Sequence, residues 1–212
     1  MTASPRILTV TLIRHAPTIY PKGTLPPYDA EVDLGDAEQI RKQSSLIPPH
    51  AEWWISPLGR CQKTADAFIE HGATKPDGKQ IVPDIEEQRY GDWHGQPIAD
   101  IWKDIEPLDK TNWHFLHPEI TPPNGESFTS LIERLEPVFE AIQSHQNEHL
   151  VLITHGMVIR GLIGLMLGLD AGRALSMKIE PLSVSQLCYM AEGHQETALN
   201  GGQWMINFLN RL

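Results

Sequence analysis

Thr11-Leu12-Ile13-Arg14-His15-Ala16-Pro17-Thr18 is the stretch that decides how this chain folds. It closes an aliphatic run from Ile7 to Ile13, which predicts a strand buried on both faces. Pro17 lacks the backbone donor needed to extend the ladder, so the strand ends beside an arginine and a histidine. We therefore expect the chemistry of this protein just past Ile13.

A second stretch, later in the chain, repeats this design. Segment 150–153 indicates another buried strand, and Thr154, His155 and Gly156 follow it before a helical run over 157–169. Parallel strands place their carboxyl ends at one edge of a sheet, and a glycine there lets backbone N–H groups approach an anion. We therefore expect both histidines to share one crevice.

The composition indicates a single globular domain over residues 1–212. The 212 residues are 41% hydrophobic and 21% charged, which suits an α/β domain with a substantial core. The formal net charge of -10 excludes a broad basic surface for nucleic acid. An anionic ligand must therefore be held by a local group of cations.

Three features bear on the cellular compartment. Cys61 and Cys188 lack the spacing of a metal or redox motif, which favours reduced thiols in a cytoplasm. The first residues of the chain do not resemble a signal peptide. The apolar stretch 158–169 is short and contains Arg160, so we expect no membrane span and no membrane partner.

Arg60 lies in the first turn of a predicted helix. Ser56 as N-cap and Pro57 at the first helical position predict a helix that runs to about Glu70. A cation is disfavoured at this positive end of a helix. Arg60 therefore either turns outward to a carboxylate such as Asp66, or holds an anion jointly with the helix terminus.

Residues 86–95 contain two adjacent carboxylates and a tight turn. Glu86 and Glu87 point in different directions on extended chain, so only one of them faces a pocket. Trp93 lies between two glycines, and large aromatic side chains dominate packing where the backbone is tight. We expect Trp93 to anchor the turn rather than to contact a substrate.

Residues 96–123 form a segment that we call the flap. A helix over 98–105 is expected, followed by irregular chain that includes Trp113. The flap either packs on the main domain or acts as a lid whose aromatic residues line a substrate pocket. His114 and His117 lack partners at metal-ligand spacing, so we expect no metal site.

The rest of the pattern alternates between strands and helices. We expect helices over 36–46 and 126–142, the second bent or interrupted by Pro137, and extended segments over 52–55, 81–85, 183–190 and 204–209.

Five separated motifs occur in order along the chain. They are Leu12-Ile13-Arg14-His15-Ala16, the helix start 56–65, segment 87–95, Pro123-Asn124-Gly125-Glu126-Ser127 and Thr154-His155-Gly156. Together they resemble the motifs of the histidine phosphatase superfamily, which also contains the cofactor-dependent phosphoglycerate mutases. The resemblance implies an α/β fold, a three-layer α/β/α sandwich with a mostly parallel central sheet like that of phosphoglycerate mutase.

The same resemblance implies the catalytic roles. His15 is the nucleophile that accepts the phosphoryl group, and Glu87 rather than Glu86 is the proton donor, with neither a metal nor another cofactor. Neighbouring arginines disfavour the imidazolium and so keep His15 neutral, as attack requires. Burial and a nearby dianion favour the protonated form of Glu87, which later acts as base toward water.

The resemblance also implies a phosphate clamp. Arg14, Arg60 and His155 are both catalytic and phosphate-binding, because positioned cations stabilise the charge on the equatorial oxygens. Many family members carry an asparagine after the first motif, and this chain lacks it, so that phosphate contact is either missing or replaced by Thr18 or Lys22. The residues expected to bind the substrate are Arg14, Thr18, Arg60, His155 and Gly156.

Three activities remain open at this point. The mutases of the family carry a longer insertion between residues 95 and 125, so the short segment here favours a phosphatase acting on a small phosphorylated metabolite. A mutase, or a module that binds phosphate or regulates without turnover, is the alternative. The Arg-His-Ala-Pro-Thr opening and the size of the chain look like alpha-ribazole phosphatases, and the protein is expected to be a monomer or a homodimer.

Overall fold

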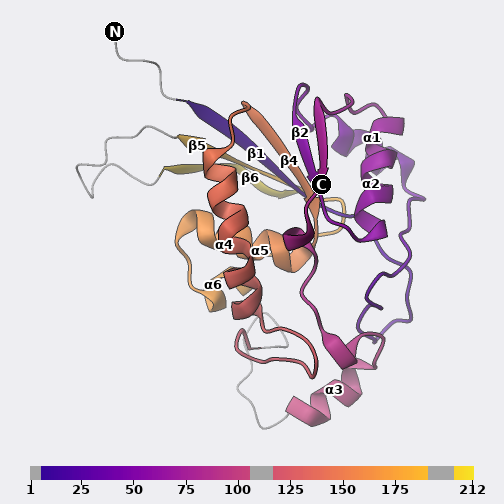
Figure 1. Cartoon of the computed structure of the whole chain (residues 1–212). Helices are drawn as coiled ribbons and strands as arrows, with labels where there is room; N and C mark the ends of the chain where they lie inside the picture. The colour runs from indigo at the N-terminus through magenta and orange to yellow at the C-terminus, as the bar shows by residue number, and fades with distance from the viewer. Residues whose placement is uncertain (1–5, 106–116, 191–202) are drawn as a thin grey trace, which may run out of the picture.

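The computed structural model describes residues 6–105, 117–190 and 203–212, and its centre is a six-stranded sheet with strand order β3-β2-β4-β1-β5-β6 (Figure 1). The four strands β3, β2, β4 and β1 are parallel to one another, whereas β5 pairs antiparallel with both β1 and β6. The expected mostly parallel α/β sandwich is confirmed. The strands are β1 (Ile7–Arg14), β2 (Glu52–Ile55), β3 (Gly78–Ile81), β4 (His149–Thr154), β5 (Val184–Met190) and β6 (Trp204–Arg211).

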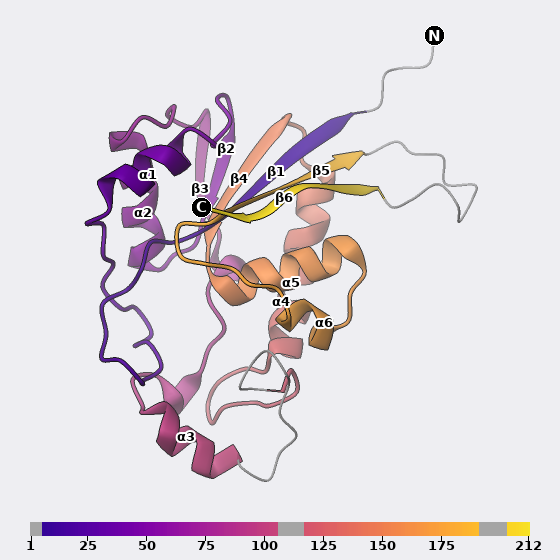
Figure 2. The same ribbon diagram turned by 180° about the vertical axis from the view of Figure 1, so that it is seen from behind.

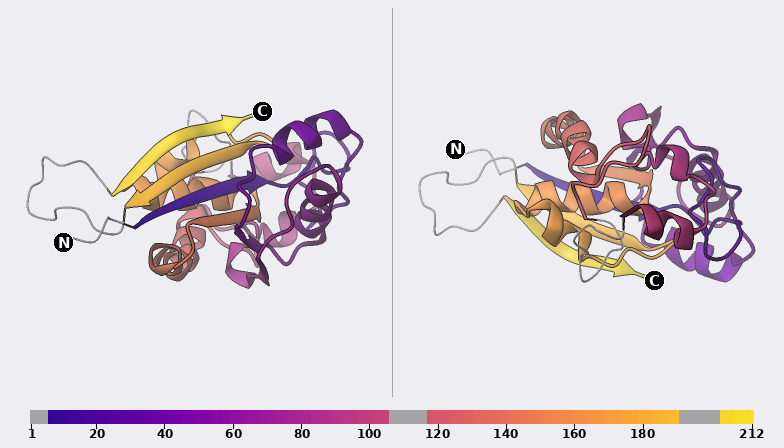
Figure 3. Two further views of the ribbon diagram at one scale, coloured as in Figure 1. Left: turned by 90° about the horizontal axis from the view of Figure 1, so that it is seen from above. Right: turned by 90° about the horizontal axis from the view of Figure 1, so that it is seen from below.

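Helices cover both faces of this sheet because the central strands are apolar on both sides. Along β4, Leu150 and Leu152 pack with α4, α5 and α6, whereas Val151 and Ile153 pack on the opposite face with α1 and α2. Figures 2 and 3 show the two helical layers on either side of the sheet. The helices are α1 (Ala37–Ser44), α2 (Gly59–Glu70), α3 (Ile98–Ile105), α4 (Phe128–Ser144), α5 (Gly156–Leu167) and α6 (Ala171–Leu175).

The strand register brings three chain segments to the same edge of the sheet. Arg14 at the end of β1 pairs with Thr154 at the end of β4, and the His15 N–H donates to the Thr154 carbonyl at 2.9 Å. On the other side of β4, the Ser56 N–H donates to the Ile153 carbonyl at 3.1 Å. The residues that follow β1, β2 and β4 therefore lie side by side.

Helix α2 begins later than the sequence predicts. Its first residue is Gly59 and its N-cap is Leu58, which makes no side-chain capping bond, so Ser56 as N-cap is wrong. The Ser56 hydroxyl instead lies 2.7 Å from the ring of His155. The hydroxyl also accepts from the Leu58 N–H at 3.4 Å, so it makes one long-range and one local contact without capping the helix.

Two other expectations also need correction. The extended segment 81–85 is wrong in its bounds, because β3 ends at Ile81 and a 3-10 turn over Pro83–Ile85 follows, begun by the proline. Of the two effects expected of Pro137, interruption is wrong, because α4 continues through it while its buried stripe packs against α5. The short helix α6 was not expected, although Asp170 caps it by accepting from the Arg173 N–H at 2.8 Å.

The described part of the flap lies beyond the end of the sheet, apart from the two helical layers (Figure 2). Ile101 and Ile105 of α3 are buried against Leu25, Tyr90 and Trp93. Trp93 is only 6% exposed, as expected of an anchor. The irregular chain of the flap that contains Trp113 and His114 lies outside the described residues, as does the stretch between β5 and β6.

Among the residues that the structure describes, no helix is long and apolar enough to cross a membrane.

Candidate active site

A cavity of about 320 Å³ opens where β1, β2 and β4 end. It combines several cationic side chains and one carboxylate with an apolar and aromatic outer wall. Its lining consists of Arg14, His15, Thr18, Tyr20, Leu25, Pro26, Pro27, Arg60, Glu87, Tyr90, His94, Gly156, Met157 and Arg160.

One ring nitrogen of His15 faces this cavity, and the other is held by a hydrogen bond to the backbone. Its Nδ1 donates to the carbonyl of the neighbouring Ala16 at 2.6 Å, so its Nε2 carries the lone pair and accepts from Arg60 Nε at 3.2 Å. The side chain is 4% exposed. Burial, and after it the charges of Arg60 and Arg14, lower the pKa of His15 well below its usual value. The ring is therefore neutral at neutral pH and fixed in orientation, as a nucleophile requires.

Arg60 points into the site, so the outward alternative is wrong. It is 6% exposed, and its Nη1 donates to the Tyr28 carbonyl at 2.7 Å, with Asp29 farther away at 3.9 Å. Asp66, the outward partner considered above, is paired with Lys79 instead. The guanidinium stays at the start of α2, where backbone N–H groups and the helix dipole add to its positive potential.

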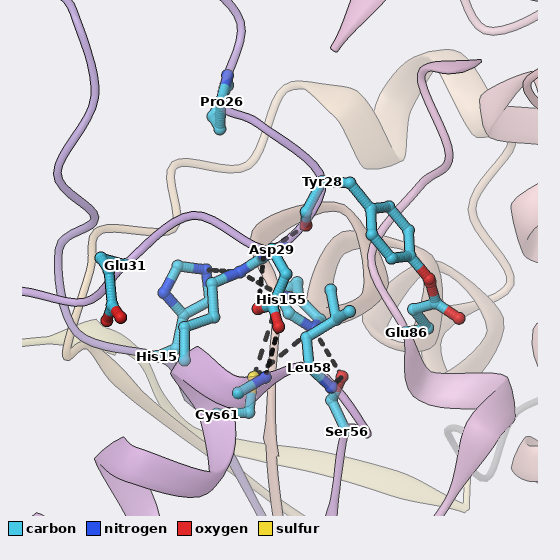
Figure 4. A network of polar contacts seen from close by, with 12 residues as sticks. His15, Pro26, Tyr28, Asp29, Glu31, Ser56, Leu58, Cys61, Glu86 and His155 are labelled. Atoms are coloured by element: carbon cyan, nitrogen blue, oxygen red, sulfur yellow. Dashed lines mark hydrogen bonds and ion pairs between the residues drawn. The ribbon is translucent and has the colours of Figure 1, made fainter. Parts of the chain in front are cut away.

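His155 lies behind the cavity wall rather than in the lining. Its Nδ1 accepts from Arg60 Nε at 3.3 Å, so its Nε2 donates to the Ser56 hydroxyl at 2.7 Å, with Cys61 Sγ at 3.4 Å (Figure 4). Its ring meets that of His15 edge-on, with 5.1 Å between centroids. Burial and the neighbouring positive groups lower the pKa of His155 well below its usual value. Arg60 thus bridges the two histidines.

Arg14 and Gly156 form the side of the site nearest to α5. Arg14 Nη1 donates to the Ile179 carbonyl at 2.6 Å, and among the described residues its buried Nε has no hydrogen-bond partner. Gly156 is the first residue of α5, so the free N–H groups of that helix begin beside Arg14. An unpartnered guanidinium nitrogen next to a helix start suits an anion.

Of the two adjacent carboxylates, Glu87 lines the cavity and Glu86 does not. Glu87 Oε1 accepts from the Gln88 N–H at 3.1 Å and from the Met157 N–H at 3.2 Å. Glu86 instead accepts a hydrogen bond from the hydroxyl of Tyr28. Glu87 is therefore held against the start of α5.

The segment that carries Glu87 is fixed by an ion pair beneath it. Arg134 of α4 donates to Glu126 at 2.7 Å and also to the carbonyls of Asp84 and Glu86, at 2.6 and 3.1 Å. Glu126 also accepts from the Arg89 N–H at 3.0 Å. Both ends of the segment are thus tied to one buried carboxylate and one arginine.

The structure brings Arg14, His15, Arg60, Glu87, Thr18 and Gly156 to the cavity, and His155 directly behind it. Lys22 is exposed and is not part of the lining, whereas Thr18 is.

Sequence reasoning missed several residues of the cavity wall. His94 is fixed there by two hydrogen bonds, one from the Tyr90 N–H at 3.1 Å and one to the Pro26 carbonyl at 3.0 Å. Arg160 is a further lining residue. Its position as a lone arginine in an apolar helical run was the signal available in the sequence.

Within residues 6–105, 117–190 and 203–212, no group of three or more His, Cys, Asp or Glu side chains is arranged to hold a metal ion.

The chain belongs to the histidine phosphatase superfamily (branch 1), whose family model matches residues 10–201. A curated relative is the 2,3-bisphosphoglycerate-dependent phosphoglycerate mutase of Bartonella henselae, 27% identical over 129 residues, which are 59% of this chain and 62% of the mutase. The chain therefore matches less than two thirds of that enzyme. Phosphoserine phosphatase 1 of Hydrogenobacter thermophilus is 23% identical over 187 residues, covering 84% of this chain and 85% of the relative.

Solved structures of the family share the fold. A mycobacterial glucosyl-3-phosphoglycerate phosphatase superposes with a TM-score of 0.74 at 20% identity, over 98% of this chain and 100% of that one. The alpha-ribazole phosphatase of Shigella flexneri gives a TM-score of 0.71 at 20% identity, over 96% of each chain. The family and the phosphatases among these relatives support the enzyme class expected from the sequence, a phosphomonoester hydrolase.

Proposed function

We propose that this protein is a phosphatase that hydrolyses a small phosphorylated metabolite through a phosphohistidine on His15, with Glu87 as proton donor. One observation carries the proposal. The Nε2 lone pair of His15 faces a cavity that also contains Arg14, Arg60 and Glu87. A nucleophile, cations for the equatorial oxygens and a proton donor are thus within one small volume.

In the first step, His15 Nε2 attacks phosphorus and the bond from phosphorus to the ester oxygen breaks. Glu87 gives its proton to that oxygen, and the alcohol leaves. Arg60 Nε, which bonds both histidines in the structure, donates to a phosphate oxygen instead, together with Arg14. The N–H groups at the start of α5 and Thr18 complete the phosphate site.

In the second step, water attacks the phosphorus of phosphohistidine. The ionised Glu87 accepts a proton from that water, the bond from nitrogen to phosphorus breaks, and inorganic phosphate leaves. His15 regains its Nε2 lone pair because its Nδ1–H stays bonded to the Ala16 carbonyl throughout. We assign His155 to orient Arg60 in the free enzyme and, once Arg60 Nε has turned to the phosphate, to support the phosphate from behind.

Two observations favour a phosphatase over a mutase. The relative matched over most of its length is a phosphatase, whereas the mutase is matched over 62% of its length. The segment between residues 95 and 125 is also too short to carry the mutase insertion expected from the resemblance. We propose that the protein is cytoplasmic, because phosphorylated metabolites occur there and the free thiols of Cys61 and Cys188 stay reduced there. We propose that it is a monomer or a homodimer.

The test is hydrolysis of p-nitrophenyl phosphate in EDTA by the wild type, His15→Ala, Glu87→Gln and His71→Ala. His71 lies at the far end of α2 and serves as the matched control. We expect wild-type and His71→Ala activity to survive EDTA and His15→Ala activity to vanish. Because nitrophenolate leaves without a proton, Glu87→Gln should still be phosphorylated and should accumulate an acid-labile, base-stable phosphoenzyme.

Retained turnover in His15→Ala would contradict the nucleophile. Absence of turnover in the wild type, combined with transfer of phosphate between phosphoglycerates, would instead establish the mutase. Phosphate binding without either reaction would establish the non-catalytic module.

A further inference from the structure

Arg160 is a third arginine in the cavity, and the catalytic steps above leave it unused. It lies in the second turn of α5, where its Nε donates to the Met177 carbonyl at 2.7 Å. Its Nη1 contacts the sulfur of Met157, a weak acceptor, at 3.1 Å. The guanidinium is therefore held in place while part of it still faces the cavity.

Arg160 has no counter-ion among the residues that the structure describes. The exposed Arg173 pairs with Asp170 at 3.0 Å, but no ion pair joins Arg160 to a carboxylate. A partly buried cation without a counter-ion is costly. Such a group is typical of a site whose ligand supplies the missing negative charge.

Arg160 lies on the leaving-group side of the cavity. Arg160 and Glu87 line the same cavity. Burial lowers the pKa of Arg160, and the negative charge of Glu87 opposes that effect. Glu87 is also bonded to the N–H of Met157, whose sulfur contacts Arg160. Since Glu87 protonates the leaving oxygen in the proposed mechanism, Arg160 lies near the group attached to that oxygen.

The charges of the described lining residues also indicate that the substrate carries a negative charge besides its phosphate. The lining contains Arg14, Arg60 and Arg160, and Glu87 is its sole acidic residue. When Glu87 carries the proton that it donates, three positive charges face a phosphomonoester with two negative charges. One further negative charge on the substrate would balance the site, and a carboxylate has that charge whereas a second phosphate would exceed it.

We propose that Arg160 binds a carboxylate on the leaving group and that the preferred substrates are phosphomonoesters of hydroxy acids. This inference rests on the proposed phosphatase function. Arg160 is then the specificity-determining residue, since a planar guanidinium matches a carboxylate in a way that the rest of the wall does not.

The test compares substrates that differ only in a carboxylate. One pair is 3-phosphoglycerate and glycerol 3-phosphate, and the other is phosphoserine and phosphoethanolamine. In each pair we expect the wild type to favour the carboxylate by about tenfold or more in kcat/KM, as a charged hydrogen bond provides. Arg160→Met should bring that ratio close to one, Arg160→Lys should retain part of it, and Arg173→Met, the exposed control, should leave it unchanged.

A ratio near one in the wild type, or an unchanged ratio in folded Arg160→Met, would overturn the proposal. Changes in the shared phosphate chemistry cancel in this ratio. Binding is measured in parallel as the rise in Tm that each member of a pair causes in His15→Ala, where no turnover is expected. A larger rise with the carboxylate, lost in the additional Arg160→Met variant, would support the site even if hydrolysis failed and the phosphatase proposal with it.

Discussion

Glu126 offers the sharpest test of how the fold supports the site. It is 8% exposed and accepts hydrogen bonds from Arg134 Nε and Nη2 at 3.2 and 2.7 Å, and from the Arg89 N–H at 3.0 Å. Glu126→Gln keeps the size and one acceptor oxygen but removes the charge. Arg134 then remains as a half-buried cation without its ion-pair partner, bonded to backbone carbonyls and at most one neutral amide oxygen.

Charged hydrogen bonds contribute about 1.5–3 kcal/mol each, and breaking a fully buried ion pair costs about 3–5 kcal/mol. Glu126→Gln loses the charge on these bonds but retains part of the geometry, and Arg134 is partly exposed. We therefore expect the free energy of unfolding to fall by about 2–4 kcal/mol and Tm by roughly 5–15 °C. Because the segment with Glu87 loosens, kcat should fall as well.

The measurement is urea unfolding at pH 7 and at pH 4, with Glu136→Gln on the exposed side of the same helix as control. Burial alone would raise the pKa of Glu126, but the bonds and charge of Arg134, with the bonds from Arg89, lower it overall. Its contribution is therefore present above the unfolded pKa of about 4.3 and is lost as pH falls through the lower folded value. A loss below about 0.5 kcal/mol at pH 7, or one equal to that of Glu136→Gln, would refute the reasoning.

Two further predictions concern the backbone and the nucleophile. In urea unfolding, Gly91→Ala should lower the free energy of unfolding by about 2–4 kcal/mol, because the new Cβ would lie 2.0 Å from the Pro123 carbonyl oxygen. The control, Gly95→Ala, has a similarly positive φ but open space around the new Cβ, so it should cost only about 1 kcal/mol. Equal losses in the two variants would contradict this prediction. Burial and the charges of Arg60 and Arg14 lower the pKa of His15, so its imidazole stays neutral below pH 6.5. The value of kcat/KM for p-nitrophenyl phosphate, corrected for ionisation of the substrate, should therefore persist at pH 5.5. A fall in this value with an apparent pKa at or above 6.5 would contradict the prediction.

Local patterns were sufficient for much of the fold. The strand β2 and the helix α3 have the bounds that the sequence predicts, because apolar spacing and turn residues determine them locally. The start of α2 could not be predicted in this way. Its natural cap, Ser56, is taken by His155, a residue that follows far later in the chain.

In the site, too, some residues were predictable from local patterns and others depend on contacts between distant segments. The strand ends predicted the positions of His15 and His155, and the structure brings them within 5.1 Å, centroid to centroid. The residues alone left Glu86 and Glu87 equivalent, and the resemblance chose between them. In the structure the difference depends on the N–H of Met157 for Glu87 and the hydroxyl of Tyr28 for Glu86, contacts between distant segments that no local pattern encodes.

The strand order also dictates when this site can first exist during synthesis. β1 leaves the ribosome first, yet both of its neighbours in the sheet, β4 and β5, belong to the last third of the chain. A nascent chain that ends before His149 contains His15 but lacks the strand beside it and the helix start that contacts Glu87. Such a chain has no complete cavity, so we expect the proposed substrate to stabilise the protein only once β4 and the start of α5 have been made.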